Sequence, residues 1–345
     1  MSANSLAILN CGLVSPVGLD APSSCAAYRA KVTNPTKTRF MDTKGEWIMA
    51  HQVPMDKSWV GIAKQARMAA MAIEEALAHI PRAQWCEIPI ILCVAEADRP
   101  GRLQGTDDQL FLQILAGLDI KAAPHSAIIA HGRVAVAVAM ARARELVNRQ
   151  SAAQVLIVAV DSLLTWSTLM HMERDNRLLT ARNADGFMPG EGAAALLVGA
   201  ASASSAQPQL LCTGIGFAQE AAHIYSEEPM RADGLSQAIK LALSEAGRQM
   251  HDFDFQMSDI SGEQFYFKEA SLALSRTLRQ RKAEFELWHP AECIGETGAL
   301  AGAAMIVMTQ TACAKGYAPG NMVMAHMSND RGQRAALALQ FGGHA

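Results

Sequence analysis

The chain has 345 residues, half of them hydrophobic, which is enough to bury a large core in two domains or in two halves of one domain. Its net charge of -3 and pI near 6.4 give no reason to expect nucleic-acid binding. The seven cysteines are scattered without C-x-x-C spacing, so we expect buried thiols in a reducing compartment and neither a metal site nor a cofactor. The first residues lack a signal-peptide pattern, and the apolar segment 127–141 is interrupted by His131 and Arg133, so we expect a cytoplasmic protein with no membrane contact.

Strands and helices are predicted in the same order twice along the chain. Continuous apolar runs predict buried strands, and helical periodicity predicts the helices between them. In the first part these are a strand, a helix, a strand, a helix and a strand, at 6–14, 62–79, 88–94, 133–148 and 155–160. The second part repeats this order at 210–216, 234–248, 253–260, 298–315 and 321–327.

This repetition predicts one layered α/β fold with an internal pseudo-twofold duplication. Strands that are apolar throughout lie in sheets covered by helices on both faces. The helices at 133–148 and 298–315 are rich in Ala, Val and Gly, which is typical of helices buried in the middle of a protein. We place the two halves at 1–205 and 206–345, and two unrelated α/β domains are the alternative.

The strongest motif is the stretch Asn183–Val198. A turn rich in Gly and Pro runs directly into six small or apolar residues, 193–198, which predicts a tight loop feeding a buried strand. With Val158-Ala-Val-Asp-Ser162, Ile294-Gly-Glu-Thr-Gly298 and Ser328-Asn-Asp-Arg-Gly332 in the same order, it resembles the β-ketoacyl synthases of the thiolase superfamily. The resemblance implies the five-layered α-β-α-β-α thiolase-like fold, usually dimeric, although the chain is short for a ketosynthase.

The resemblance also implies a catalytic cysteine at the start of the first buried helix and two histidines from the second half. Alignment places Ile129 at the cysteine, Ser261 at the first histidine and Glu296 at the second. An isoleucine cannot form a thioester, and a carboxylate reverses the charge that an imidazole offers to an oxyanion. We therefore expect that condensation is lost. Arg331 stands where the family has an aromatic gate, and an ion pair between Glu296 and Arg331 would close the old pocket.

Other side chains near the expected pocket offer alternatives. Ser126 with His125 or His131 could form a new nucleophile and base, or Ser126 could cap the helix while both histidines are partly exposed; we favour the cap. Cys293 could be a displaced thiol, but a packed cysteine is favoured. We interpret Glu191 and Glu269 as structural, the aromatic run 265–267 as core or dimer interface, and the charged segment 96–105 as a solvated loop.

Three functions fit these expectations. The first is a non-catalytic, ketosynthase-like scaffold that binds another protein. This version resembles either the silent partner subunits of polyketide synthases or, preferred here, the thiolase-like accessory proteins found with type VI secretion effectors in bacteria. The second is an enzyme with altered acyl-transfer chemistry at Ser126 or Cys293. The third is a protein that binds an acyl chain without a covalent bond. All three are compatible with a homo- or heterodimer.

Overall fold

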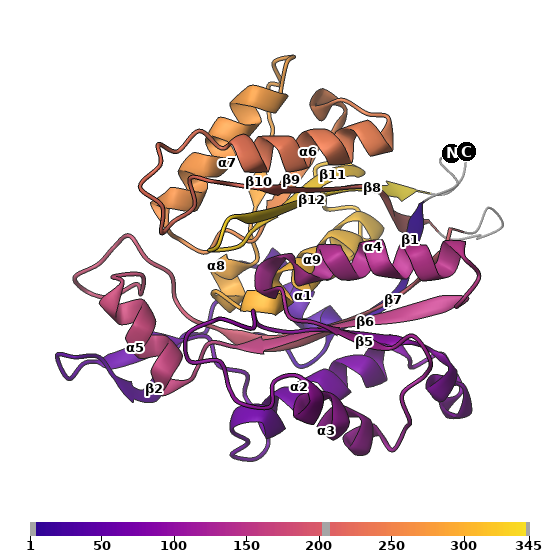
Figure 1. Ribbon diagram of the computed structural model, residues 1–345, viewed down its shortest axis with the longest axis horizontal. Helices are drawn as coiled ribbons and strands as arrows, with labels where there is room; N and C mark the ends of the chain where they lie inside the picture. The colour runs from indigo at the N-terminus through magenta and orange to yellow at the C-terminus, as the bar shows by residue number, and fades with distance from the viewer. Residues whose placement is uncertain (1–4, 202–207, 343–345) are drawn as a thin grey trace.

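The computed structural model describes residues 5–201 and 208–342 and shows five layers of helices and sheet (Figure 1). The predicted boundary between the halves, at 205/206, lies outside the described residues. No described helix is both long enough and apolar enough to cross a membrane.

The first half carries strands and helices in the predicted order, with several additional short elements. Its strands are β1 (Leu6–Val14), β2 (Thr36–Met41), β3 (Trp47–Ala50), β4 (Ile90–Cys93), β5 (Ala127–Ile129), β6 (Gln154–Ser162) and β7 (Glu191–Ala200). Its helices are α1 (Ala21–Arg29), α2 (Gly61–Ala76), α3 (Asp108–Leu118), α4 (Ala135–Asn148) and α5 (Trp166–Arg174), with 3-10 turns η1 (Arg82–Glu87) and η2 (Gly132–Val134).

The second half repeats this pattern. Its strands are β8 (Gln209–Gln219), β9 (Phe255–Ser258), β10 (Leu287–Trp288), β11 (Met322–Ser328) and β12 (Gln333–Gly342). Its helices are α6 (Asp233–Ala246), α7 (Gln264–Thr277), α8 (Ala291–Ile294) and α9 (Ala301–Ala314), with 3-10 turns η3 (Met250–Asp252) and η4 (Gly298–Leu300).

The strand order confirms the pseudo-twofold duplication. The large sheet runs β10-β9-β11-β12-β8-β1-β7-β6-β4-β5, and the two central strands, β1 and β8, are antiparallel and joined only through Leu6–Ile8. Outward from each central strand, the next two pairings are antiparallel and the last two are parallel. The two halves of this sheet form separate layers on either side of α4 and α9 (Figure 1).

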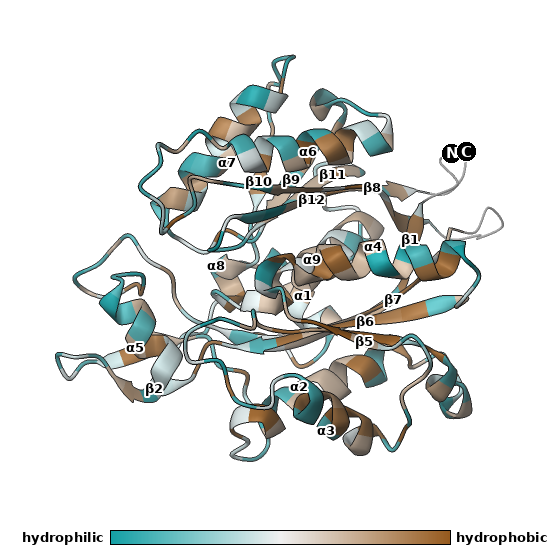
Figure 2. Ribbon diagram, in the orientation of Figure 1, coloured by the Kyte–Doolittle hydropathy of each residue, from teal (hydrophilic) through white to brown (hydrophobic). Residues whose placement is uncertain are grey.

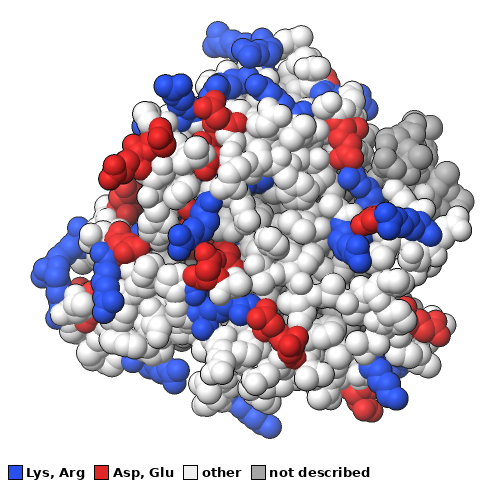
Figure 3. Space-filling view, in the orientation of Figure 1, with Lys and Arg blue, Asp and Glu red and all other residues white. Residues whose placement is uncertain are grey.

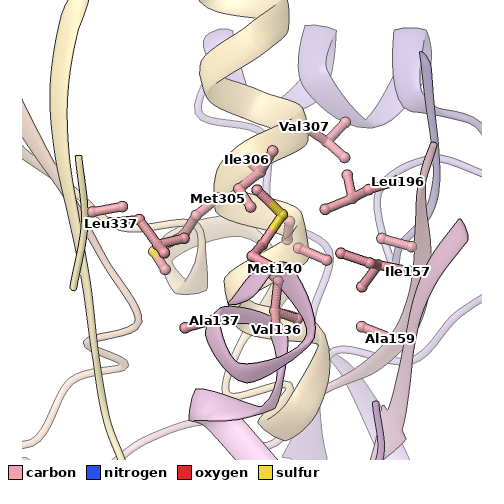
Figure 4. Close-up of a cluster of buried hydrophobic side chains, with 14 of the residues drawn as sticks. Val136, Ala137, Met140, Ile157, Ala159, Leu196, Met305, Ile306, Val307 and Leu337 are labelled. Carbon is pink, nitrogen blue, oxygen red and sulfur yellow. The ribbon is translucent and has the colours of Figure 1, made fainter. Parts of the chain in front are cut away.

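The core lies between these two sheet layers. Val136, Ala137 and Met140 of α4 and residues 305–307 of α9 pack against each other, with β6 and β7 on one side and β12 on the other (Figure 4). These strands are mostly apolar in their central residues (Figure 2), because central helices cover one face and outer helices cover the other, although β6 ends at Asp161-Ser162 and β12 carries the buried Arg334. As its composition indicates, α9 is buried over nearly its whole length, whereas α4 is buried over its first turns and exposes Arg142 in its second half.

Glycines bring the outer helices close to the sheet at equivalent places in both halves. A Cβ on Gly12 of β1 would lie 2.2 Å from the Ala72 carbonyl oxygen of α2, and a Cβ on Gly216 of β8 would lie 1.9 Å from that of Ala238 in α6. Both contacts are shorter than a Cβ allows, so only glycine permits this packing.

Candidate functional site

The stretch Asn183–Val198 fixes the position of Glu296. The backbone N–H of Gly190 donates to the Glu296 carbonyl at 2.7 Å, and the Glu296 N–H donates to the Met188 carbonyl at 2.8 Å. A Cβ on Gly190 would lie 2.2 Å from the Ile294 carbonyl oxygen, so this close backbone contact requires glycine. The strongest sequence motif therefore has a structural task that does not depend on catalysis.

The turn before α4 buries a guanidinium group beside Glu296. Gly132 adopts φ +51°, and a Cβ there would lie 2.0 Å from Glu96 Oε1, so the turn is tightly packed. The next residue, Arg133, is buried with its side chain 5% exposed. Its side chain lines a cavity of only about 30 Å³ that Glu296 and Asp330 also line.

Arg133 is the centre of a cluster of buried charges. Its Nη2 donates to the hydroxyl of Tyr266 at 2.7 Å and also to Asp330. Its guanidinium carbon lies 4.6 Å above the Tyr266 ring, and its Nη1 lies 3.5 Å from Glu296 Oε2. Its Nε lies 3.9 Å from Asp259 Oδ2. One buried cation therefore serves three carboxyl groups and one phenol, an arrangement in which loss of the cation leaves several charges uncompensated.

A second arginine ties this cluster to the loop after α5. Arg177 donates to Glu263 through Nε and Nη2, both at 2.7 Å, and to Asp330 Oδ2 at 2.5 Å. Its Nη1 also donates to the Tyr225 hydroxyl at 3.0 Å. Asp330 thus lies between two guanidinium groups, and these hold its pKa well below its usual range although burial opposes the shift.

The sequence interpretation of the segment 96–105 as a solvated loop is wrong, because a third arginine in this segment has a buried partner. Arg99 makes a bidentate pair with Asp161, with both distances 2.7 Å, and its side chain is only 11% exposed. The Pro100 and Gly101 carbonyls accept from Thr168 and Thr165 of the α5 region, each at 3.1 Å. The segment therefore packs over the charged cluster, because its arginine has a buried partner.

Carboxyl groups outnumber guanidinium groups in this charged cluster. Three arginines face five carboxyl groups, namely Asp161, Asp259, Glu263, Glu296 and Asp330. Burial raises the pKa of Asp259 to about 7, and nearby Arg133 only partly offsets this. One Asp259 oxygen accepts from the Ser328 N–H at 2.9 Å, and the other has no hydrogen-bond partner among the described residues. Asp259 therefore holds a proton up to near-neutral pH.

The predicted triad positions have different surroundings. Ile129 ends β5, is half-buried and packs against the core. The Ser261 hydroxyl is buried without a hydrogen-bond partner among the described residues, whereas Glu296 belongs to the charged cluster. The predicted partner of Glu296 is wrong, because its carboxylate faces Arg133. Arg331 is instead 61% exposed and lies 3.5 Å from Asp98.

The predicted role of Ser126 as a helix cap is also wrong. β5 and η2 separate Ser126 from α4, and the Ser126 hydroxyl accepts from the Ile90 N–H at 3.0 Å. It therefore ties β5 to the start of β4. The His131 carbonyl accepts from the Asn329 side chain at 3.1 Å, and the His131 residue is exposed. No hydrogen bond joins Ser126 to His125 or His131 in the described part of the chain.

The remaining sequence interpretations concern structural residues. Glu191 pairs with Lys64 and accepts from the Ser162 hydroxyl at 2.9 Å, and fully buried Glu269 pairs with Arg334 at 2.8 Å. Both glutamates join separate segments, as expected. In the aromatic run 265–267 the middle residue, Tyr266, belongs to the charged cluster, while Phe267 is 36% exposed.

Cys293 is packed in the core, being 1% exposed, and burial raises the pKa of its thiol to about 11. We expect that incubation with acyl-CoA leaves the intact mass of the protein unchanged. Thiol-specific alkylation of the native protein should instead label exposed Cys86, and Cys86→Ser is the control that removes this label. An acyl adduct mapped to Cys293 or Ser126 would restore the hypothesis of altered acyl-transfer chemistry.

A larger cavity opens beside the charged cluster. It has a volume of about 290 Å³, and its lining includes Glu96, Met172, Tyr225, Asp330 and Arg331. Of the four residues predicted around the old pocket, only Arg331 lines it; Ser126, His131 and Cys293 do not. The sequence interpretation missed Arg133, Arg177 and Asp330. The available signal was an arginine in the turn His131-Gly-Arg-Val-Ala135, directly before the six apolar residues 135–140 that begin α4.

Comparisons with known proteins agree with this architecture. No protein-family model and no curated protein matches the sequence. Solved structures do match: the ishigamide ketosynthase/chain length factor has a TM-score of 0.77 at 17% identity, with 100% of both chains covered. An oxazolomycin ketosynthase domain of Streptomyces albus has a TM-score of 0.78 at 14% identity, covering 97% of this chain and 75% of that one.

A ketosynthase in complex with its chain length factor, from Xenorhabdus doucetiae, has a TM-score of 0.75 at 12% identity, with 98% of both chains covered. At these identities the likeness concerns the fold alone. Together with the strand order, it shows that the chain has the five-layered thiolase-like fold of the ketosynthases.

Proposed function

We propose that this protein is a non-condensing subunit that pairs with a second, catalytically active ketosynthase. The observation that carries the proposal is the charged cluster around Arg133, which includes Glu296, the position that the resemblance assigns to a catalytic histidine. Its arginines are engaged by carboxylates and phenols, so they offer no free charge to a developing oxyanion. Ile129 supplies no nucleophile.

The size of the inner cavity argues against an acyl-binding role. A cavity of about 30 Å³ has room for only a few water molecules, and an acyl chain needs more space. The lining consists largely of charged groups, including Arg99, Arg133, Arg177 and Glu296, which an apolar chain would have to desolvate. We therefore rank binding of a free acyl chain below pairing with another protein.

Two kinds of partner were open from the sequence. The solved structures of this fold include a ketosynthase together with its chain length factor, and this favours a ketosynthase as the partner. The type VI secretion effector preferred from sequence has no observation in its favour among the contacts or comparisons described above. On the face in Figure 3, basic and acidic side chains are interspersed, without one large basic patch for an acidic carrier protein.

The open edge of β5 is the surface we propose for pairing. β5 is the last strand of the large sheet, and no described strand pairs with its outer edge. Its three residues, Ala127–Ile129, are apolar and half-buried. Proteins protect such edges with charges, prolines or a covering partner, and β5 contains neither a charge nor a proline. A partner strand would complete the hydrogen bonds of this edge.

The test is to mix the purified chain with a ketosynthase from the same organism that retains the Cys-His-His site. We expect native mass spectrometry to detect a heterodimer, and condensation to depend on the partner's cysteine and not on this chain. Ile128→Lys places a charge on the edge of β5 and should weaken pairing at least about tenfold. Leu241→Lys is the matched control, because Leu241 is 42% exposed on α6 in the outer layer of the other half.

Thermal unfolding of each variant alone checks that the fold is intact. Condensation by this chain without a partner would overturn the proposal. So would a stable monomer that binds no ketosynthase at micromolar concentration, or equal pairing by both lysine variants.

A further inference from the structure

We propose that the protein has a second binding site, for a small aromatic carboxylate, at the opposite end of the large sheet from β5. The site is a cavity of about 510 Å³, within the range of small-molecule pockets. We call it the Trp288 pocket. It is lined by Tyr28, Arg29, Lys31, Leu287, Trp288, Tyr317 and one acidic residue, Glu286, whose carboxylate accepts from the Trp288 N–H. None of these residues lines the cavities at the charged cluster, so the inference does not depend on the proposed pairing function.

Three separate segments build the aromatic walls of this pocket. The end of α1 supplies Tyr28, the edge strand β10 supplies Trp288, and the turn after α9 supplies Tyr317. The Trp288 ring packs against Phe255 at 4.9 Å and against Tyr28 at 6.3 Å between ring centroids, and its N–H donates to Glu286 at 2.6 Å. The walls are thus held in place before any ligand arrives, which lowers the entropic cost of binding.

The pocket contains a cation without an acidic partner. Arg29 makes no ion pair with any described residue, and its guanidinium carbon lies 4.6 Å above the Tyr317 ring. The neighbouring Lys31 is already paired with Glu292. A guanidinium group held flat on an aromatic ring still presents its N–H edge, and that edge matches the two oxygens of a carboxylate.

Two phenol groups of the pocket also lack partners. The hydroxyls of Tyr28 and Tyr317 are buried and have no hydrogen-bond partner among the described residues. Tyr28 is only 3% exposed, and unsatisfied polar groups at that depth are costly. Burial raises the pKa of both phenols, so they remain protonated and able to donate at neutral pH. The aromatic walls and the guanidinium group without an acidic partner define the ligand class, whereas the two buried hydroxyls are not exposed to the pocket.

The probe is 2-naphthoate, with the uncharged 2-naphthamide as its matched control and cyclohexanecarboxylate as the non-aromatic acid. Isothermal titration calorimetry of the purified chain should show that 2-naphthoate binds about tenfold more tightly than either control. The amide lacks the charge-assisted hydrogen bond and the cyclohexane acid lacks the ring stacking, and tenfold corresponds to about 1.4 kcal/mol for each. Equal binding of 2-naphthoate and 2-naphthamide, or no binding of 2-naphthoate at millimolar concentration, would overturn the proposal.

Variants locate the binding. Arg29→Gln should weaken 2-naphthoate about tenfold and leave 2-naphthamide unchanged, since only the acid uses the charge. Arg67→Gln removes an exposed arginine from α2 in the outer layer of the first half and should change neither affinity. Because Arg29 is exposed at the end of α1, its replacement should not unfold the chain, and a thermal unfolding curve checks this. If Arg29→Gln binds 2-naphthoate as tightly as the natural chain does, the assigned site is wrong.

Discussion

Arg133→Met is expected to lower the free energy of unfolding by about 3–5 kcal/mol, as is typical when one partner of a buried ion pair is removed. Methionine can fill the space of the arginine stem but brings no charge. Asp330 would then keep Arg177 as its one remaining arginine partner. Glu296 would lose the guanidinium group that now lies 3.5 Å from its carboxylate. The Tyr266 hydroxyl would also lose its donor at 2.7 Å. The measurement is equilibrium unfolding in urea, followed by circular dichroism.

Two further variants separate the buried charge from the loss of any arginine. Arg142→Met removes an arginine from the exposed face of α4, where it is 46% exposed and pairs with Glu145, and should cost less than about 0.5 kcal/mol. Asp330→Asn introduced into Arg133→Met should recover part of the loss, because it removes one of the uncompensated charges. If the free energy of unfolding of Arg133→Met lies within about 1 kcal/mol of that of the natural chain, the buried carboxylates do not depend on Arg133 for compensation.

The fold could be predicted because each core strand is recognisable in the sequence as a run of apolar residues. β6 and β7 are buried except for one end residue each, so most of their sequences are continuous apolar runs, and the same holds for most of β11 and β12. The duplication was visible because the equivalent strands and central helices of both halves carry equivalent apolar patterns. The β2–β3 hairpin was missed because four of the six β2 residues are exposed and the strand has no apolar period.

The charged cluster could not be predicted because its partners are far apart in the chain. Arg133 and Tyr266 are separated by 133 positions, Arg177 and Asp330 by 153, and Arg133 and Asp330 by 197. The sequence showed opposite charges at Glu296 and Arg331, and from these alone their pairing was a reasonable hypothesis. The fold instead directs Arg133 into the site and leaves Arg331 at the surface, because only Arg133 stands on the turn before a buried helix.

Asp259→Asn is compared with the natural chain by the difference between their free energies of unfolding. This difference is expected to shift in favour of Asp259→Asn by about 2–3 kcal/mol when the pH rises from about 5 to about 8. Burial raises the pKa of folded Asp259 to about 7 from an ordinary value of 3.8. Between these values the folded state holds a proton that the unfolded state has released. The natural chain therefore loses stability as pH rises through this window, by about 1.4 kcal/mol per pH unit, and the loss is complete above the folded pKa.

Comparing the two chains isolates Asp259 from other buried groups that titrate. Burial lowers the pKa of His326 to about 4, which makes stability rise with pH over part of the same window. His326 is present in both chains, so its contribution cancels in their difference. Asparagine keeps an oxygen that can accept from the Ser328 N–H, and its amide replaces the protonated carboxyl. Urea unfolding at several pH values between about 5 and about 8 gives both curves. A difference that stays constant across this range would mean that Asp259 is ionised throughout and that the nearby Arg133 fully offsets the effect of burial on its pKa.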